Sequence, residues 1–526
     1  MATARLAAEI HPPEETRDFG AHMGRISRQS LVFFAGTIFT ASAGYLFKIY
    51  LARSLGAESL GVYALGMTIA GLLGIFNGLG LPQTAVRFVS AYAATRRFDL
   101  LRGFLLWGGG LMLACSFLVG GLVLFVGPWV AVRFYHTPAL KPYLRLFALI
   151  VFFGAVNVFL GQILTGYKDV TRRTVITNFI GIPVTMLIAL VAISQGFGLR
   201  GYITAQVVGA AFVLFLLGLS VWRLTPRAVR CFAAKMPRLE KRVISFSGAA
   251  LSVGFLEFAI GQTDKVLIGF YLNVRVLGIY TVAAALVTFV PIVLQSVNQI
   301  FSPTIADLHA RGQLELLGRI FQTLTRWILA CTIPLAAGII VFAPSLMRIF
   351  GRAFEAGWPI LVIGTLGQLV NCGVGSVGYL LLMSGNQARL IHAQALSAVV
   401  MVLLGLALIP TWGITGAALA AAITNVVTNL LCLREVRLNV GLSPFTRSYF
   451  RLLLPTVSAV VALLLWRDAL MAFRPQWVVI AAGFLLAYLI FGVVTWAHGL
   501  DADDHFIATT AWARMRGFLF KAEAST

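Results

Sequence analysis

Acidic residues are scarce in this sequence, which has 19 Asp and Glu against 41 Lys and Arg and a net charge of +22 at pH 7. Charged residues make up 11% of the 526 residues, whereas soluble domains have roughly 25%. This shortage, with 59% hydrophobic residues, excludes a large soluble domain. The positive charge is then typical of loops beside an anionic membrane surface and does not indicate a nucleic-acid partner.

The five cysteines give no sign of a disulfide framework or a metal site, because the sequence has no CxxC pair and no Cys/His ligand spacing. Four of them lie in apolar runs, and Cys231 lies in a basic stretch. The dipeptide Gly-Lys is also missing, which excludes the nucleotide-binding motif GxxxxGK[ST]. The sequence therefore predicts no cofactor, no metal ion and no ATP-driven step within this chain.

Apolar runs are abundant, and each is long enough to cross a hydrocarbon core of about 30 Å. We predict an all-α polytopic membrane protein with about 14 transmembrane helices. The side that holds the N-terminus carries most of the Lys and Arg residues between the predicted spans. By the positive-inside rule, the terminal tails, 1–29 and 499–526, are expected in the cytoplasm of a bacterium, with the helices in its inner (cytoplasmic) membrane.

The chain contains an internal repeat. The motif LGVYALG at 60–66 returns as LGIYTVA at 277–283, 217 residues later, and each copy follows a lysine in an apolar run, Lys48 or Lys265. Six predicted spans separate the copies, so both halves have the same orientation in the membrane. Parallel repeats of this kind are typical of transporters in which a path between two bundles opens to each side in turn.

The repeat divides the chain into two predicted six-helix lobes followed by a helix pair. The predicted parts are an N-lobe at 30–223, a basic cytoplasmic linker at 224–243, a C-lobe at 244–434 and two further helices at 452–498.

Within the repeated motif, the small and aromatic residues have separate predicted roles. Gly61 and Gly278 are predicted to form tight outer turns, because each follows a predicted span. Tyr63 and Tyr280 are predicted to lie in the aromatic belt of the membrane interface.

Three stretches carry a family resemblance: LARSLGAESLGVYAL, TDKVLIGFYLNVRVLGIYTVAAAL and LLMSGNQAR. They resemble the polysaccharide-biosynthesis flippases of the multidrug/oligosaccharidyl-lipid/polysaccharide exporter superfamily, and the resemblance covers residues 25–500 approximately. It implies a V-shaped, two-lobed transporter that moves an undecaprenyl-pyrophosphate-linked oligosaccharide from the inner to the outer leaflet. It also implies contact with membrane lipids and with polysaccharide polymerase or export machinery. The resemblance assigns no role to any single residue.

Two carboxylates in the predicted seventh span are candidates for ion coupling. Glu257 lies near the middle of that span, where a charge costs at least ~2.5 kcal/mol. Asp264 follows seven residues later on nearly the same helix face. One hypothesis is that they bind H⁺ or Na⁺ and couple transport to its gradient. The alternatives are a hydrogen-bonded carboxyl in a helix contact for Glu257 and an ion pair near the outer interface for Asp264.

Four basic residues are candidates for contact with an anionic substrate. Lys48 and Lys265 occupy equivalent repeat positions, where they either line a cationic cavity or extend their ammonium groups to lipid headgroups. Arg53 follows the first predicted span on the outer side. Arg87 follows the second span on the inner side, where its guanidinium suits a pyrophosphate that enters from the inner leaflet. The alternative for both arginines is an ordinary positive-inside residue or a contact with lipid headgroups.

These features favour a flippase driven by an ion gradient or the membrane potential, for O-antigen, capsule or exopolysaccharide synthesis. A cation-coupled multidrug exporter of the same superfamily is the first alternative, although it would favour acidic and aromatic cavity residues. A membrane-embedded sugar polymerase or ligase is the second, but the predicted outer loops are too short to carry its catalytic groups. The sequence therefore predicts a transporter and not an enzyme.

Overall fold

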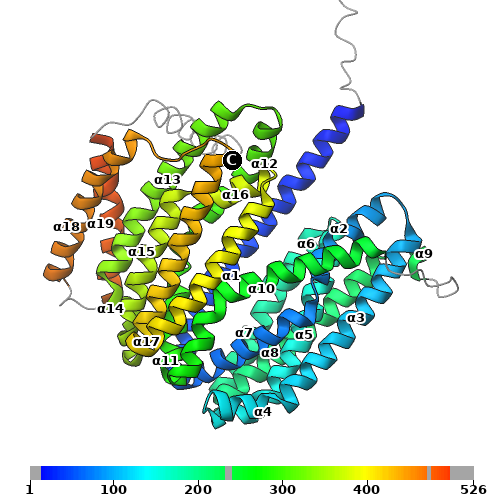
Figure 1. Ribbon diagram of the computed structural model, residues 1–526. Coiled ribbons are helices and arrows are strands. Elements are labelled where there is room, and N and C mark those ends of the chain that lie inside the picture. Colours follow the sequence, from blue (N-terminus) through cyan, green and yellow to red (C-terminus); the bar gives the residue numbers. More distant parts are fainter. Residues whose placement is uncertain (1–13, 231–239, 471–475, 498–526) are drawn as a thin grey trace, which may run out of the picture. The chain divides into compact units, whose positions relative to one another are not determined.

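The computed structural model describes residues 14–230, 240–470 and 476–497, and over these residues the chain is helical with no β-strand (Figure 1). Its contacts divide the chain into two compact units. The first unit comprises Met1–Ser54, Ile69–Arg133 and Pro138–Gly254, and the second comprises Leu55–Thr68, Phe134–Thr137 and Phe255–Thr526. Residues 55–68 and 134–137 pack with the second unit, so the contact units cross the boundaries of the two predicted lobes.

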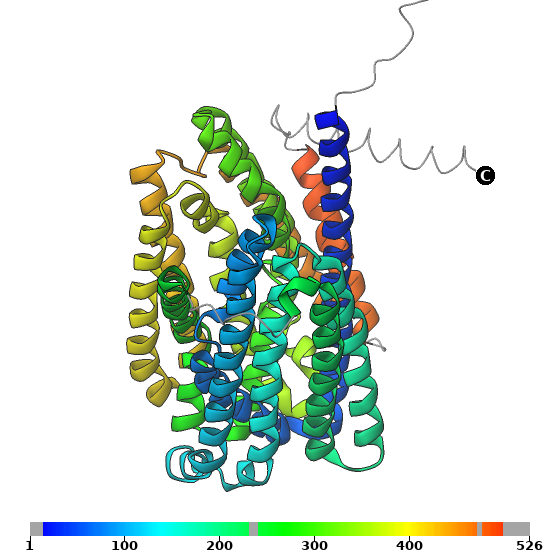
Figure 2. The same ribbon diagram turned by 90° about the vertical axis from the view of Figure 1, so that its right-hand side faces the viewer.

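The first unit is a bundle built around α5 (Leu144–Gly166), which packs against α2, α3 and α8. Phe104 and Phe159 belong to its buried core. Within this unit, α2 ends and α6 begins at one end of the bundle, and α4 lies at the opposite end (Figures 1 and 2). Its other elements are α1 (Glu14–Gly78, in part), α2 (Leu81–Ala94), α3 (Phe98–Phe125), α4 (Gly127–Trp129), η1 (Val130–Phe134), η2 (Pro138–Tyr143), α6 (Val170–Thr174), η3 (Val175–Gly181), α7 (Ile182–Ser194), α8 (Gly198–Leu224), α9 (Arg227–Arg230) and the first part of α10 (Lys241–Tyr271).

The second unit is organised around α15 (Trp358–Val374), which packs against α13 and α17. The final helix pair, α18 and α19, packs against α13 through a cluster that includes Phe342, Leu463 and Ile480. The other elements are the second part of α10, α11 (Val274–Val287), α12 (Ile292–Ala310), α13 (Leu314–Val341), α14 (Ala343–Arg348), η4 (Arg352–Gly357), α16 (Val377–Met383), α17 (Gln387–Asn439), η5 (Arg447–Leu452), α18 (Leu453–Leu470) and α19 (Gln476–Ala497).

The described residues contain 10 helical stretches long and apolar enough to cross a membrane, or 11 if α11 and the start of α12 form one bent span. Two of them, Ser42–Ala94 and Gln387–Asn439, have 53 residues each, while one crossing needs about 20. Their helices break at Gly56 and Gly413, where φ is +77° and +58°. The all-α polytopic class is confirmed, and the number of 14 spans stays a prediction.

The repeated motif has a different geometry from the predicted one. The turns fall five residues earlier, at Gly56 and at its repeat equivalent Asn273, whose side chain caps α11 by accepting a hydrogen bond from the Val276 N–H at 3.0 Å. Gly61 and Gly278 lie inside helices. The prediction that these two glycines form outer turns is therefore wrong.

These two glycines instead allow the two copies of the motif to touch backbone to backbone within the second unit. A Cβ atom on Gly278 would lie 2.0 Å from the Ala57 carbonyl oxygen, and one on Gly61 would lie 1.6 Å from that of Val274. Both pairs are related by the 217-residue offset, so the contact is reciprocal about a local twofold axis. This symmetry is what a duplicated sequence produces when its two copies pack on each other.

Candidate functional site

A cavity of about 650 Å³ lies in the first unit, between α2 and the first turns of α10. We call it the arginine pocket, because three guanidinium groups and one carboxylate line it. Its charged and polar lining residues are Arg87, Arg97, Arg242, Glu240, Tyr92, Thr95 and Ser245, and its aromatic ones are Phe88 and Phe246. With three guanidinium groups against one carboxylate, the lining keeps an excess of positive charge.

Arg87 is held against the aromatic wall of this pocket. Its guanidinium carbon lies 4.7 Å from the ring centre of Phe246 and 5.8 Å from that of Phe88, which is cation–π distance. Stacking fixes the plane of the group and leaves its N–H edges for a ligand in that plane. A guanidinium fixed in this way suits bidentate binding of a phosphate.

Glu240 organises the other side of the arginine pocket. Its carboxylate lies 3.8 Å from the Arg97 guanidinium and accepts a 2.9 Å hydrogen bond from the Tyr92 hydroxyl. It stands directly before α10, whose N-terminal N–H groups add positive potential at this point. Because Glu240 neutralises only one arginine, Arg87 and Arg242 remain to attract an anion.

A second cavity, of about 320 Å³, lies among α1, η3, α5, α7 and α8 of the first unit. We call it the Lys48 pocket. Its polar lining residues are Lys48, Asn157, Thr177, Thr185, Tyr202 and Gln206. It shares no lining residue with the arginine pocket, so the structure places the candidates Lys48 and Arg87 in two separate cavities.

A model of the family described as "Polysaccharide biosynthesis protein" matches residues 50–356, which is more than half of the chain. The chain belongs to the polysaccharide biosynthesis protein family. The resemblance first seen in the three sequence stretches is thereby confirmed.

Relatives of this polysaccharide biosynthesis protein span most of its length. The probable low-salt glycan biosynthesis flippase Agl15 of Haloferax volcanii is 22% identical over 77% of this chain and 82% of its own. An uncharacterized membrane protein of Methanocaldococcus jannaschii, MJ1068, is 20% identical over 72% of this chain and 77% of its own. The lipid II flippase MurJ in an inward closed conformation superposes with a TM-score of 0.70 at 15% identity, over 89% of this chain and 99% of that one, and so shares its fold.

The remaining basic candidates of the polysaccharide biosynthesis protein line neither pocket. Arg53 is exposed on α1, just before the break at Gly56. Lys265 is half-buried on α10, where its ammonium donates a 2.8 Å hydrogen bond to the Gln262 side chain. Lys48 and Lys265 therefore have different surroundings although they occupy equivalent repeat positions.

The two carboxylates on α10 also differ in their surroundings. Asp264 is buried and accepts a 2.6 Å hydrogen bond from the Tyr280 hydroxyl, as well as one from the Lys265 N–H. Tyr280 is itself only 2% exposed, so the prediction that it lies in the interface belt is wrong. The nearest partner of Asp264 is thus a hydroxyl on the second copy of the repeated motif.

Glu257 is exposed near the middle of the 31-residue α10 and, within the part of the chain that the structure describes, makes no hydrogen bond or ion pair. A carboxylate at that depth cannot face hydrocarbon at low cost, so an exposed one is expected to face water. The alternative of a hydrogen-bonded carboxyl in a helix contact is therefore not seen among the described residues, and neither of the two cavities described above includes Glu257.

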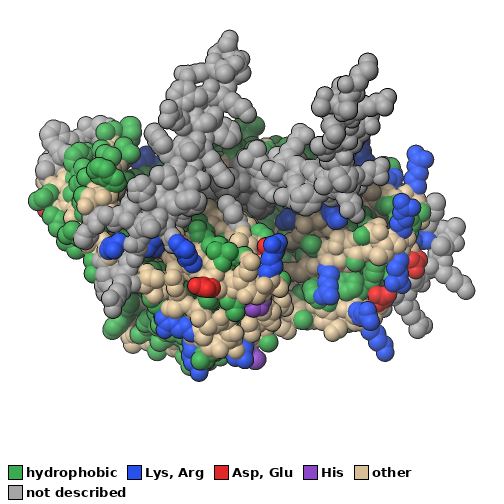
Figure 3. Space-filling view, turned by 90° about the horizontal axis from the view of Figure 1, so that it is seen from above, with side chains coloured by type: hydrophobic (Ala, Val, Ile, Leu, Met, Phe, Trp, Pro, Cys, Tyr) green, Lys and Arg blue, Asp and Glu red, His purple; other side chains and the backbone are tan. Residues whose placement is uncertain are grey.

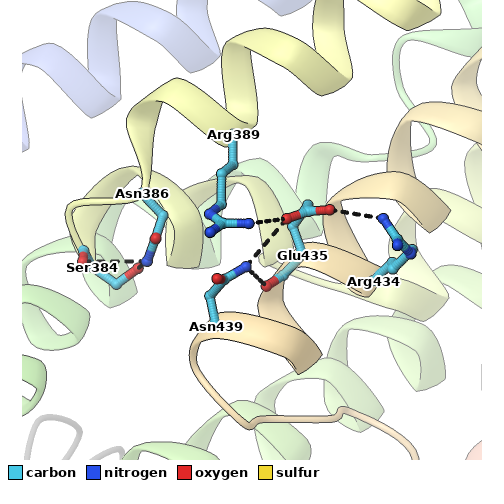
Figure 4. Close-up of polar contacts among 6 residues, drawn as sticks. All are labelled: Ser384, Asn386, Arg389, Arg434, Glu435 and Asn439. Carbon is cyan, nitrogen blue, oxygen red and sulfur yellow. Dashed lines mark hydrogen bonds and ion pairs between the residues drawn. The ribbon is translucent and has the colours of Figure 1, made fainter.

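The motif SGNQAR, part of the family resemblance, runs into the first turn of α17, where Asn386 bonds to Ser384 and Arg389 separately reaches residues near the other end of α17 (Figure 4). Arg389, near its start, donates a 2.9 Å hydrogen bond to Glu435, near its end, and Arg434 and Asn439 bond to the same carboxylate. Because α17 reverses direction at Gly413, this ion pair joins the ends of two antiparallel segments. Its contacts are satisfied internally, which indicates a structural role.

Proposed function

We propose that this protein is a flippase that moves an anionic, undecaprenyl-pyrophosphate-linked oligosaccharide from the inner to the outer leaflet by alternating access, with the arginine pocket as the site that captures the pyrophosphate. Family membership and the fold shared with a lipid II flippase support the class of activity. The observation that supports an anionic substrate is the excess of positive charge in the lining of the arginine pocket. A pyrophosphate suits it, because its oxygens accept several charge-assisted hydrogen bonds at once.

Capture from the inner leaflet requires that the arginine pocket face the cytoplasm. On the end of the molecule seen in Figure 3, Lys and Arg side chains are far more common than Asp and Glu. An excess of basic side chains is typical of the cytoplasmic side. This supports the orientation proposed here, with the C-terminal end of α2 on the cytoplasmic side.

The driving force proposed for this flippase is an ion gradient or the membrane potential, with Glu257 as the residue that binds H⁺ or Na⁺. Its exposure in the middle of α10 supports this role. Asp264 is proposed as a second acceptor, with Tyr280 holding its carboxylate. A pump for organic cations would need an acidic binding cavity, and the charge of the arginine pocket argues against that alternative.

Two experiments test this proposal: depletion of the protein, and binding of inorganic pyrophosphate to the purified full chain. Depleting the protein should cause the lipid-linked oligosaccharide to accumulate on the inner leaflet. Unchanged glycolipids together with new drug sensitivity would instead identify a drug exporter.

The Arg87→Gln variant tests the pocket in the purified full chain. Loss of its charge-assisted bonds, worth about 1.5–3 kcal/mol, should weaken binding of inorganic pyrophosphate roughly 10- to 150-fold. Arg145→Gln is the control, because Arg145 is exposed at the start of α5 and lines neither pocket. Equal affinities in the two variants would exclude the arginine pocket as the capture site.

A further inference from the structure

The Lys48 pocket is lined by one positively charged ammonium group and by several hydrogen-bond acceptor oxygens. A simple ion does not suit both. The Thr177 hydroxyl lies within hydrogen-bond distance of the Arg173 carbonyl (2.9 Å) and of the Asn178 side-chain oxygen (2.8 Å), and Thr185 donates its hydroxyl hydrogen to the Gly181 carbonyl. The lone pairs of both hydroxyl oxygens therefore remain as acceptors. Asn157 uses its amide N–H on the Ala210 carbonyl, and its Oδ1 atom is buried without a hydrogen-bond partner.

The Asn157 oxygen needs a donor, because a buried acceptor without one costs about 1–3 kcal/mol. The two threonine oxygens can each accept a further hydrogen bond. An inorganic anion without a hydroxyl group, such as chloride or sulfate, brings no hydrogen to donate, so it would leave the Asn157 oxygen without a donor. A metal cation would suit those oxygens but would meet the ammonium of Lys48 in the same cavity. A ligand with several hydroxyl groups and one acidic group can donate hydrogen bonds to the oxygens and can pair with the ammonium of Lys48.

The remaining walls suit a sugar ring. Phe47 and Tyr202 contribute aromatic rings whose centres lie 6.3 Å apart. The volume of about 320 Å³ is at the small end of ligand pockets, which begin at about 300 Å³. One wall comes from η3, a seven-residue π-helix, and π-helical turns occur often at functional sites.

We infer that the Lys48 pocket binds one acidic sugar unit of the transported glycan, with its carboxylate on Lys48 and its hydroxyl groups donating to Asn157, Thr177 and Thr185. Asn157 Oδ1 is covered in this conformation, so its side chain turns toward the pocket on binding. The assignment rests on the proposed flippase function and adds a sugar subsite separate from the pyrophosphate site. The chain would then discriminate among lipid-linked glycans by their sugars as well as by the shared pyrophosphate.

The experiment measures binding of free glucuronate, glucose and acetate to the purified full-length protein in nanodiscs, by isothermal titration. Glucuronate should bind at least tenfold more tightly than either glucose or acetate. Lys48→Met should lower glucuronate affinity at least tenfold and leave glucose affinity unchanged. Thr177→Val, which keeps the side-chain shape, should weaken both sugars.

The matched control is Thr204→Val, because Thr204 is exposed on α8 and lines neither pocket. Acetate affinity equal to that of glucuronate, no binding of either, or no effect of Lys48→Met would each overturn the inference. Inorganic pyrophosphate is titrated in the same samples. If it binds in an Arg87-dependent way while glucuronate does not, the sugar subsite falls and the flippase proposal stands.

Discussion

Replacing Gly278 with alanine should destabilise the protein through the reciprocal contact of the two motif copies. The added Cβ would lie 2.0 Å from the Ala57 carbonyl oxygen, where ordinary contact begins at 3.4 Å. The two helices must therefore separate by more than an ångström, since neither partner is a side chain that can rotate away. Overpacking of this kind costs about 1–3 kcal/mol, and a backbone-to-backbone clash belongs at the upper end of that range.

Denaturation of the purified protein in micelles measures this cost. Gly61→Ala should have a similar effect, because its Cβ would lie 1.6 Å from the Val274 carbonyl oxygen. The double variant should cost less than the two single changes together, because the first already separates the helices. Gly248→Ala on α10 is the control, since its Cβ would meet nothing within 4 Å. If Gly278→Ala is as stable as this control, the close contact does not exist.

Two further predictions concern the acids on α10. Glu257→Gln should abolish or strongly slow transport, measured as glycolipid flipping. The variant should still insert into the membrane and unfold like the wild type, as measured by denaturation. Transport at the wild-type rate would remove the coupling role of Glu257. Tyr280→Phe should cost about 1–3 kcal/mol of stability, because buried Asp264 loses a hydroxyl donor. That cost should largely disappear in an Asp264→Leu background, and a cost unchanged there would mean that Tyr280 acts through other contacts.

The helical class and the repeat could be predicted because they depend on composition and on spacing along the chain. Long apolar runs permit one kind of secondary structure in a membrane, and the 217-residue offset recurs directly in the contacts of Gly61 and Gly278. The position of the turns could not be predicted. Gly56 and Asn273 perform the same task by different means, one by a positive φ and the other by a side-chain cap, so they do not look alike in the sequence.

The candidate site was only partly visible in the sequence because its residues come from distant segments. Arg87 was a candidate, but its pocket also needs Arg97 and the residues Glu240 and Arg242, which lie about 150 positions away along the chain. Those two stand at the end of a basic linker, where further charges carry little information by themselves. The repeat also suggested equal roles for Lys48 and Lys265, whereas local packing decides that one lines a cavity and the other bonds to Gln262.

A single helix, α10, carries residues of both proposed sites. Its first half carries Arg242 and Phe246 of the arginine pocket, and its second half carries Glu257 and Asp264, all on one uninterrupted helix. At 1.5 Å per residue, Phe246 and Glu257 are separated by roughly 16 Å along the axis. The arginine pocket belongs to the first contact unit and the two acids to the second, because the boundary between the units falls within this helix, between Gly254 and Phe255. The proposed sites of anion capture and of ion binding are therefore connected through the backbone of a single helix, although they belong to different contact units.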